Sequence, residues 1–147
     1  ELCRYQSDSI DCWLCKPQTY MNDSGTAVSA LIKYYKIPIN QILIVHDEID
    51  LDVGNLRFKI GGGHGGNNGV KDIIDKVGDP NFNRLRIGIG HPGSADKVVS
   101  YVLSKPSTMD SLSIADGISK TIDEHENLFK GQIRDLMNQN NRRNKLD

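Results

Sequence analysis

The sequence predicts a single α/β domain, and three features of its central region support that fold class. Residues 42–45 form an apolar run that ends in His-Asp-Glu (46–48), as in a buried strand that carries polar groups to a sheet edge. Residues 55–60 alternate between apolar and polar or basic side chains, which predicts a second strand with one apolar and one basic face. Apolar residues then recur at helical spacing over residues 70–77, and Gly78 ends that run.

The residues before this centre predict two strands and a helix. We expect short strands over residues 1–6 and 12–16, on either side of the turn at 6–9. A helix follows and continues to about Lys36, because Pro38 cannot continue it. Its possible N-caps are Asn22, Asp23 and Ser24, and its predicted buried face consists of Ala27, Val28, Leu31 and Tyr34 or Tyr35.

The residues after the centre predict one more strand and two helices. The strand covers residues 85–89, and a short helix over 95–103 turns Val98, Val99 and Val102 inward. A longer helix covers about 108–130, and its predicted inward residues are Leu112, Ala115, Ile118, Ile122 and Phe129. Ile133, Leu136 and Met137 add an amphipathic turn or two, and residues 138–147 should form a frayed tail.

Composition favours one globular domain over residues 1–147, with 37% apolar and 25% charged residues. No apolar run approaches the length of a membrane span, and no signal peptide is recognisable, so we expect a cytoplasmic protein. Cys12 and Cys15 are three apart, which on a strand places them on opposite faces. Ordinary reduced cysteines are therefore favoured over a metal or redox pair. Because the sequence begins at Glu1 without a methionine, we also expect that an upstream segment is missing.

Charge is uneven along the chain, although the net charge is −1. Residues 1–52 carry 4 basic and 8 acidic side chains, whereas residues 53–105 carry 8 basic and 4 acidic ones. The middle third is therefore where we expect a polyanion or a phosphate to bind.

The glycine-rich stretch 61–69 allows three chemical interpretations. Gly61, Gly63 and Gly66 match the G-x-G-x-x-G pattern of dinucleotide-binding oxidoreductases, but chance supplies that pattern in a run with six glycines. A metal site could be built from histidines and carboxylates, namely His46, Asp47, Glu48, Asp50, Asp52 and His64, although strand neighbours point to opposite faces. The third interpretation is acid–base hydrolysis of a phosphate-rich substrate, with Asp47 orienting the base and the basic strand holding the polyanion.

Four long phrases resemble the bacterial-type peptidyl-tRNA hydrolase family, and they occur in that family's order. They are residues 19–25 (TYMNDSG), 46–50 (HDEID), 61–69 (GGGHGGNNG) and 84–93 (RLRIGIGHPG). The resemblance covers essentially the whole chain. It implies a mixed, twisted sheet surrounded by helices, and hydrolysis of the ester between a peptide and the 3′ ribose of tRNA. It further implies a monomer that needs no metal or other cofactor, no membrane and no protein partner.

The resemblance also implies roles for individual residues. Asp47 matches the carboxylate that orients the catalytic histidine, and Asn22 and Asn68 match the asparagines that hold the peptidyl end and position the attacked carbonyl and water. Tyr20 and Met21 match the wall of the peptide site. Basic positions that face tRNA phosphates match Arg57, Lys59 and Arg86. Amide groups suit a developing oxyanion because they donate without titrating, and arginine forks suit phosphate.

One part of the family pattern has no counterpart in the sequence. The family opens with a strand, an Asn-Pro-Gly turn and an Arg-His-Asn phrase that holds the general base, so the first strand and this histidine are expected to be absent from these residues. We therefore expect the 147 residues alone to cleave peptidyl-tRNA poorly. A non-catalytic domain that binds RNA or phosphate is the main alternative. In either case His64 can be a loop-packing residue and Asn67 a turn residue with positive φ.

Overall fold

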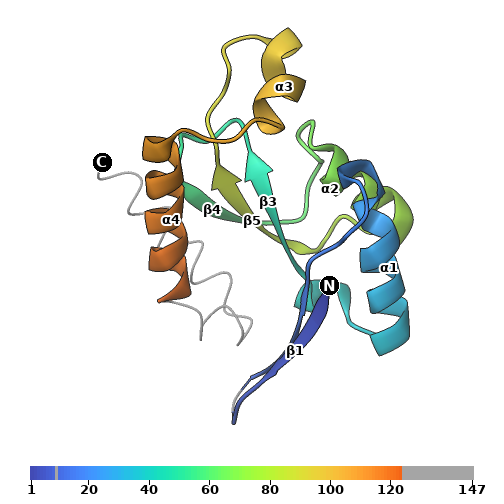
Figure 1. The fold of residues 1–147 in the computed structure, drawn as a ribbon. Helices are drawn as coiled ribbons and strands as arrows, with labels where there is room; N and C mark the ends of the chain where they lie inside the picture. Colours follow the sequence, from blue (N-terminus) through green and yellow to red (C-terminus); the bar gives the residue numbers. More distant parts are fainter. Residues whose placement is uncertain (9, 124–147) are drawn as a thin grey trace.

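The computed structural model describes residues 1–8 and 10–123, and a mixed sheet lies at its centre (Figure 1). Strand β3 (Leu43–Glu48) pairs in parallel with β5 (Asn83–Gly88), and β5 pairs antiparallel with β4 (Leu56–Ile60). The predicted α/β class is therefore confirmed. Several predicted features lie outside the described residues, namely the helical residues 124–130 with Phe129, the turn at 133–137 and the tail at 138–147.

Helices cover both faces of this sheet (Figure 1). Helices α1 (Ser24–Tyr35) and α2 (Asn68–Val77) lie on one side, and α4 (Thr108–Ile122) lies on the other. The core on the α1/α2 side is built from Val28, Val70, Ile73 and Phe82, and the core on the α4 side from Leu56, Phe58 and Leu85. No helix in the described part of the chain is both long and apolar enough to span a membrane.

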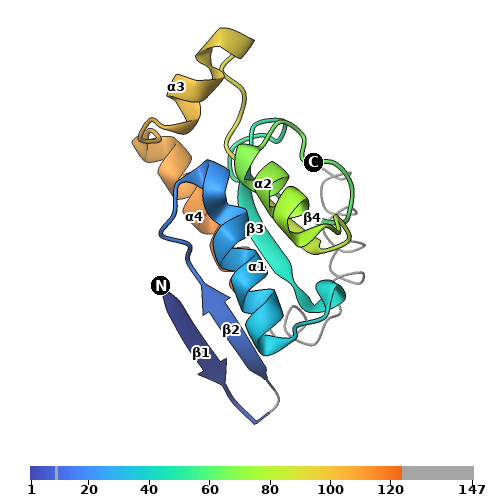
Figure 2. The ribbon, with the colours of Figure 1, turned by 90° about the vertical axis from the view of Figure 1, so that its right-hand side faces the viewer.

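The first two strands form a hairpin apart from the central sheet. Strands β1 (Leu2–Gln6) and β2 (Asp11–Cys15) pair antiparallel and lie beside α1 (Figure 2). The Trp13 ring stacks on Tyr35 of α1, with 4.4 Å between ring centroids, and this contact fastens the hairpin to the domain. All three cysteines are free thiols, as predicted.

Strand β3 is not the buried strand that the apolar run 42–45 predicts. None of its six residues is fully buried, and Val45 is 54% exposed. The reason is its position, because β5 is the only neighbour of β3 among the described residues. An outer strand has fewer side chains around it than the central strand of a sheet.

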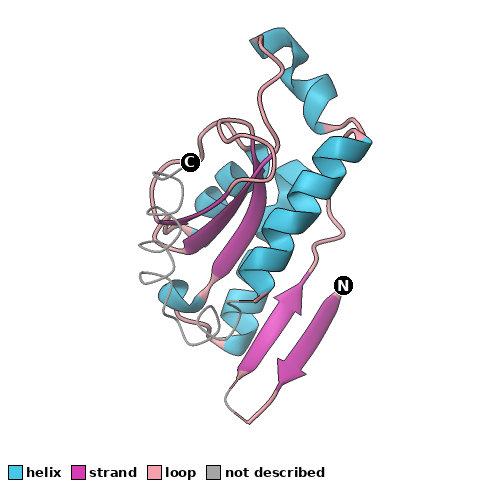
Figure 3. Cartoon of the chain, turned by 90° about the vertical axis from the view of Figure 1, so that its left-hand side faces the viewer, coloured by secondary structure: helices cyan, strands magenta, loops and turns pink. Residues whose placement is uncertain are grey.

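The predicted inward faces of the last two helices are also largely wrong. A short 3-10 turn (Ala95–Lys97) leads into α3 (Val98–Val102), which projects away from the sheet and leaves Val99 and Val102 exposed (Figure 1). Helix α4 turns Ile114, Gly117, Ile118 and Thr121 inward, whereas Leu112, Ala115 and Ile122 are exposed. Figure 3 shows α4 lying along this side of the sheet. A Cβ on Gly117 would lie 2.4 Å from the Gly54 carbonyl oxygen, so α4 packs tightly at this glycine. Hydrophobic periodicity does not include glycine in the apolar face of a helix.

Candidate functional site

Asp47 stands near the end of β3, and its carboxylate is held by the N-cap residue that precedes α2. The Nδ2 group of Asn67 donates to Asp47 Oδ1 at 3.0 Å. The Oδ1 atom of the same asparagine accepts from the backbone N–H of Val70, also at 3.0 Å, and so caps α2. One amide therefore connects the end of β3 to the first turn of α2.

Asn67 is a site residue that the sequence interpretation missed. As the N-cap it has φ −72° and ψ 115°, so the expected positive φ is wrong. Its place immediately before a predicted helix, three residues ahead of a buried valine, is the signal that could have identified it. Asn68, the predicted catalytic residue, is the first residue of α2 and its side chain is exposed beside this contact.

The turn before α1 meets the start of α2 at a very short distance. This turn is the 3-10 segment Met21–Asp23, and a Cβ added to Gly69 would lie 2.5 Å from Met21 Sδ and 3.2 Å from the Met21 carbonyl oxygen. Because Asn22 follows Met21 and Asn68 precedes Gly69, the contact brings the two predicted asparagines to one junction although they are 46 positions apart. Tyr20 is 88% exposed at the same turn, so it is not a core residue.

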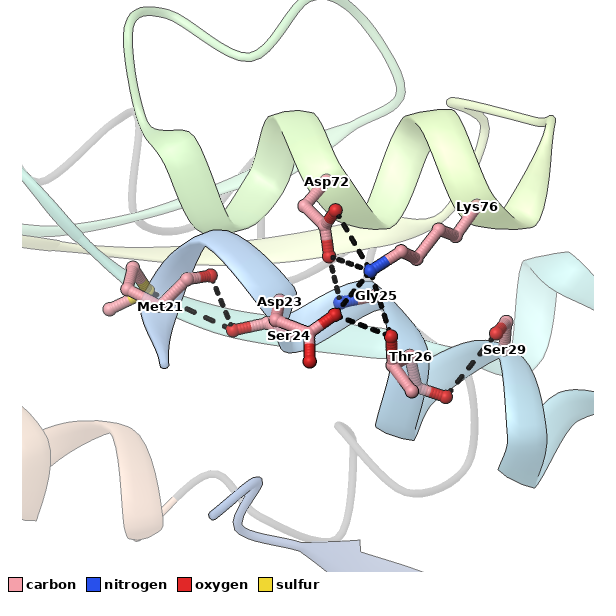
Figure 4. Close-up of polar contacts among 8 residues, drawn as sticks. All are labelled: Met21, Asp23, Ser24, Gly25, Thr26, Ser29, Asp72 and Lys76. Carbon is pink, nitrogen blue, oxygen red and sulfur yellow. Dashed lines mark hydrogen bonds and ion pairs between the residues drawn. The ribbon is translucent and has the colours of Figure 1, made fainter. Parts of the chain in front are cut away.

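A polar clamp keeps the first turn of α1 against α2 (Figure 4). The backbone N–H of Gly25 donates to Asp72 Oδ2 at 2.7 Å. Lys76 reaches from α2 to the Asp23 carboxylate, and it also contacts Asp72 at 3.1 Å and the Thr26 hydroxyl at 2.7 Å. The hydrogen bond with Asp23 raises the pKa of Lys76, and the same contact lowers the pKa of Asp23. The clamp ties the first turn of α1 to the middle and the last turn of α2.

The predicted basic residues lie on one face of the sheet. In the antiparallel register Arg57 stands opposite Arg86, and Lys59 stands opposite Arg84. Directly opposite residues share a face, and so do residues two apart, so all four side chains are on the same side. The Arg86 guanidinium also lies 3.7 Å from the Glu48 carboxylate, so this ion pair partly neutralises its positive charge.

Arg84 differs from the other three because it is turned into the protein. It is 2% exposed, and its guanidinium donates to the backbone carbonyl oxygens of Gly62 and Gly63. Burial lowers the pKa of this guanidinium, and the neighbouring positive charge of Arg86 lowers it further. The sequence interpretation did not assign a role to Arg84, which anchors the glycine loop ahead of Asn67.

The three described histidines have backbone partners and do not contact the Asp47 carboxylate. The Nδ1 atoms of His64 and His91 accept from the backbone N–H two residues on, at 3.1 and 3.0 Å. His46 Nδ1 donates to the Asp47 carbonyl oxygen at 2.7 Å, and burial lowers the pKa of His46. The remaining histidine, His125, lies outside the described residues.

The geometry disagrees with two of the alternative chemistries. Within residues 1–8 and 10–123, no group of three or more histidine, cysteine, aspartate or glutamate side chains is arranged to hold a metal ion. The G-x-G-x-x-G match lies between β4 and α2, but β4 runs antiparallel to the next strand, β5. A dinucleotide site of that kind needs a parallel strand–helix–strand unit, so the oxidoreductase interpretation is wrong.

Comparison with known proteins gives one consistent result. The family model described as "Peptidyl-tRNA hydrolase" matches residues 1–147. The peptidyl-tRNA hydrolase of Neisseria meningitidis serogroup A is 47% identical over 135 residues, which cover 92% of this chain and 70% of the relative. That of Coxiella burnetii is 50% identical over 127 residues, which cover 86% of this chain and 68% of the relative. The crystal structure of peptidyl-tRNA hydrolase from Acinetobacter baumannii matches with a TM-score of 0.89 and 43% identity, covering 94% of this chain and 70% of that one.

Proposed function

Because the chain belongs to the peptidyl-tRNA hydrolase family, we propose that it hydrolyses the ester bond between peptide and tRNA, which releases the tRNA for reuse. The observation that carries this proposal is the junction of three chain segments. The end of β3, the start of α2 and the turn before α1 bring Asp47, Asn68 and Asn22 to one place.

The roles of these residues follow from their chemistry. Ester hydrolysis by water passes through a tetrahedral intermediate, in which the former carbonyl oxygen carries negative charge. The amides of Asn22 and Asn68 donate toward that oxygen and hold the peptidyl end. Exposed Tyr20 and Met21 line the place of the peptide next to them.

Asp47 orients the general base in this proposal. A carboxylate that accepts from an imidazole N–H keeps the opposite ring nitrogen free to take a proton from water. None of His46, His64 and His91 contacts the Asp47 carboxylate, so the base is assigned to the histidine of the family's Arg-His-Asn phrase, which the 147 residues do not contain.

The tRNA part of the substrate is assigned to the basic face of the sheet. Arg57 and Lys59 on β4, and Arg86 on β5, would contact backbone phosphates as positive charges and hydrogen-bond donors. The protein would act as a cytoplasmic monomer, as one domain over residues 1–147, without a metal ion or other cofactor.

The deciding experiment measures release of free tRNA from peptidyl-tRNA, with and without EDTA. The sample is the protein purified from its natural source. We expect hydrolysis that the chelator does not abolish. Binding of tRNA without hydrolysis would contradict the proposal and favour the RNA-binding alternative. Loss of hydrolysis in EDTA would contradict the metal-free mechanism.

Asn68→Ala tests the proposed oxyanion donors. We expect turnover to fall about 10²- to 10³-fold, because one preorganised donor is lost, while the thermal unfolding midpoint stays unchanged. Asn40→Ala is the matched control, since this exposed asparagine precedes β3 at the opposite end of that strand. Wild-type turnover in Asn68→Ala would show that this amide has no role in the reaction.

The double variant Arg57→Ala/Lys59→Ala tests the basic face. Each phosphate contact adds to the steepness with which tRNA affinity falls with salt, so we expect the logarithmic slope to flatten by roughly one to two. A Lys16→Ala/Lys33→Ala variant removes the same charge from exposed positions elsewhere and should keep the wild-type slope. Equal slopes in the two double variants would remove Arg57 and Lys59 from the interface.

A further inference from the structure

The Asn67 side chain is the direct hydrogen-bond link between the proposed catalytic carboxylate and the helix that presents Asn68. Its Nδ2 group lies 3.0 Å from Asp47 Oδ1 and 3.4 Å from the Asp47 carbonyl oxygen. Its Oδ1 atom is occupied by the backbone N–H of Val70. Because an N–H can only be matched by the amide oxygen, the cap fixes the orientation of the amide and turns its N–H donor toward Asp47.

We propose that Asn67 is a positioning residue, which holds the Asp47 carboxylate against the first turn of α2 and on which turnover depends through its Nδ2 donor. The inference rests on the proposed hydrolase function and extends it to a residue with no assigned role. Asn67 would not touch the substrate and would act through Asp47.

An amide suits this task better than a charged partner would. It fixes one carboxylate oxygen by a directional hydrogen bond but leaves the negative charge of Asp47 in place. Oδ2 has no hydrogen bond with the described residues, so it remains for the imidazole of the base. The Asp47 backbone is held as well, because His46 Nδ1 donates to its carbonyl oxygen. The carboxylate is thus restrained at Oδ1 and at the main chain, and Oδ2 is the oxygen left open.

A helix cap alone would give the same geometry, so the experiment must separate capping from positioning. Serine and aspartate cap helices about as well as asparagine. Asn67→Ser keeps a capping oxygen but loses the donor to Asp47. Asn67→Asp keeps both the shape and the cap, but it places a second carboxylate against Asp47. Asn67→Ala loses the cap and the donor together.

The natively purified protein and these three variants are compared by thermal unfolding, by kcat and KM for peptidyl-tRNA, and by pH–rate profile. We expect Asn67→Ala to lose roughly 3–6 °C in unfolding midpoint and Asn67→Ser to keep the wild-type midpoint. In Asn67→Ser we expect kcat to fall about tenfold with KM unchanged, because the carboxylate is less well placed. In Asn67→Asp the acid limb of the profile should move upward by about one pH unit, since two adjacent carboxylates resist ionising together.

Three outcomes would overturn the inference. Wild-type kcat and pH profile in Asn67→Ser and Asn67→Asp would reduce Asn67 to a helix cap. A raised KM with unchanged kcat would make it a substrate-binding residue instead. An Asn67 side-chain amide signal in the NMR spectrum that does not respond to Asp47→Ala would disprove the contact itself. That last measurement does not depend on enzymatic activity, so it tests this inference separately from the proposed function. If the wild-type protein does not hydrolyse peptidyl-tRNA, the proposed function is overturned instead.

Discussion

Gly25→Ala is the substitution for which sequence and structure predict opposite effects. Gly25 lies in the first turn of α1, where alanine is the better helix former by about 0.5–1 kcal/mol. Propensity alone therefore predicts a more stable protein. The structure predicts the reverse, because a Cβ at this position would lie 2.4 Å from the Asp72 carbonyl oxygen and 2.9 Å from Asp72 Oδ2.

The magnitude follows from how far α1 and α2 must separate. Side-chain Cβ atoms essentially never approach another heavy atom within 3.0 Å, so the Asp72 carbonyl must retreat by at least the missing 0.6 Å (3.0 − 2.4). Overpacking of this kind costs about 1–3 kcal/mol, which exceeds the gain in helix propensity. The same movement weakens the hydrogen bond from Gly25 N–H to Asp72, 2.7 Å long in the wild type. We expect a net loss of about 1–2 kcal/mol.

The assay combines urea unfolding with peptidyl-tRNA hydrolysis under conditions where the variant is folded. A displacement approaching 1 Å between Asn22 and Asn68 should lower turnover about tenfold or more. Gly63→Ala is the stability control, because no atom lies within 4 Å of the Cβ it would add and its φ is not positive. If Gly25→Ala were as stable and as active as the wild type, the close approach of α1 and α2 would not hold the site together.

Two further predictions concern Arg84 and His46. Arg84→Met should cost about 1–3 kcal/mol, since the Gly62 and Gly63 carbonyls lose their donors; an unchanged urea midpoint would contradict the anchoring role. Burial lowers the pKa of His46 below its ordinary 6.5, so the unfolded state binds more protons and stability falls as pH drops through and below that value. His46→Asn keeps an N–H donor without this titration and should therefore lose less stability than the wild type between pH 7.5 and 5; parallel stability curves would exclude His46 as the cause.

Elements with strong local signals were predictable from the sequence. The alternation over residues 55–60 gave β4, and the apolar spacing that ends at Gly78 gave α2, whose C-cap has φ 78°. Asp47 could be proposed as a site residue from its place at the end of an apolar run, whereas Asn22 and Asn68 were proposed only through the resemblance to the family. Their contribution to the reaction stays a prediction.

Features that depend on tertiary contacts were not predictable in this way. Arg84 and Arg86 alternate along β5 like two equivalent basic residues. Yet Arg84 is buried and donates to carbonyl oxygens of the glycine loop, whereas Arg86 forms an ion pair with a carboxylate. Hydrophobic periodicity assigned Leu112 to the core, whereas α4 contacts β4 and its turn through Gly117 and Ile118. In both cases the deciding partner lies far away in sequence, and residue type alone does not reveal it.

The two glycines at the α1–α2 junction explain why each proposed catalytic asparagine has a glycine close behind it. Gly69 follows Asn68 directly and admits the Met21 backbone, and Gly25 lies three residues after Asn22 and admits the Asp72 backbone. Each contact positions an amide that it does not itself touch, so a chain could keep both asparagines and still lose the arrangement. The presence of Asn22 and Asn68 in a sequence is therefore weaker evidence for an active site than their presence together with both glycines, Asp72 and Lys76, which hold the start of α1 against α2.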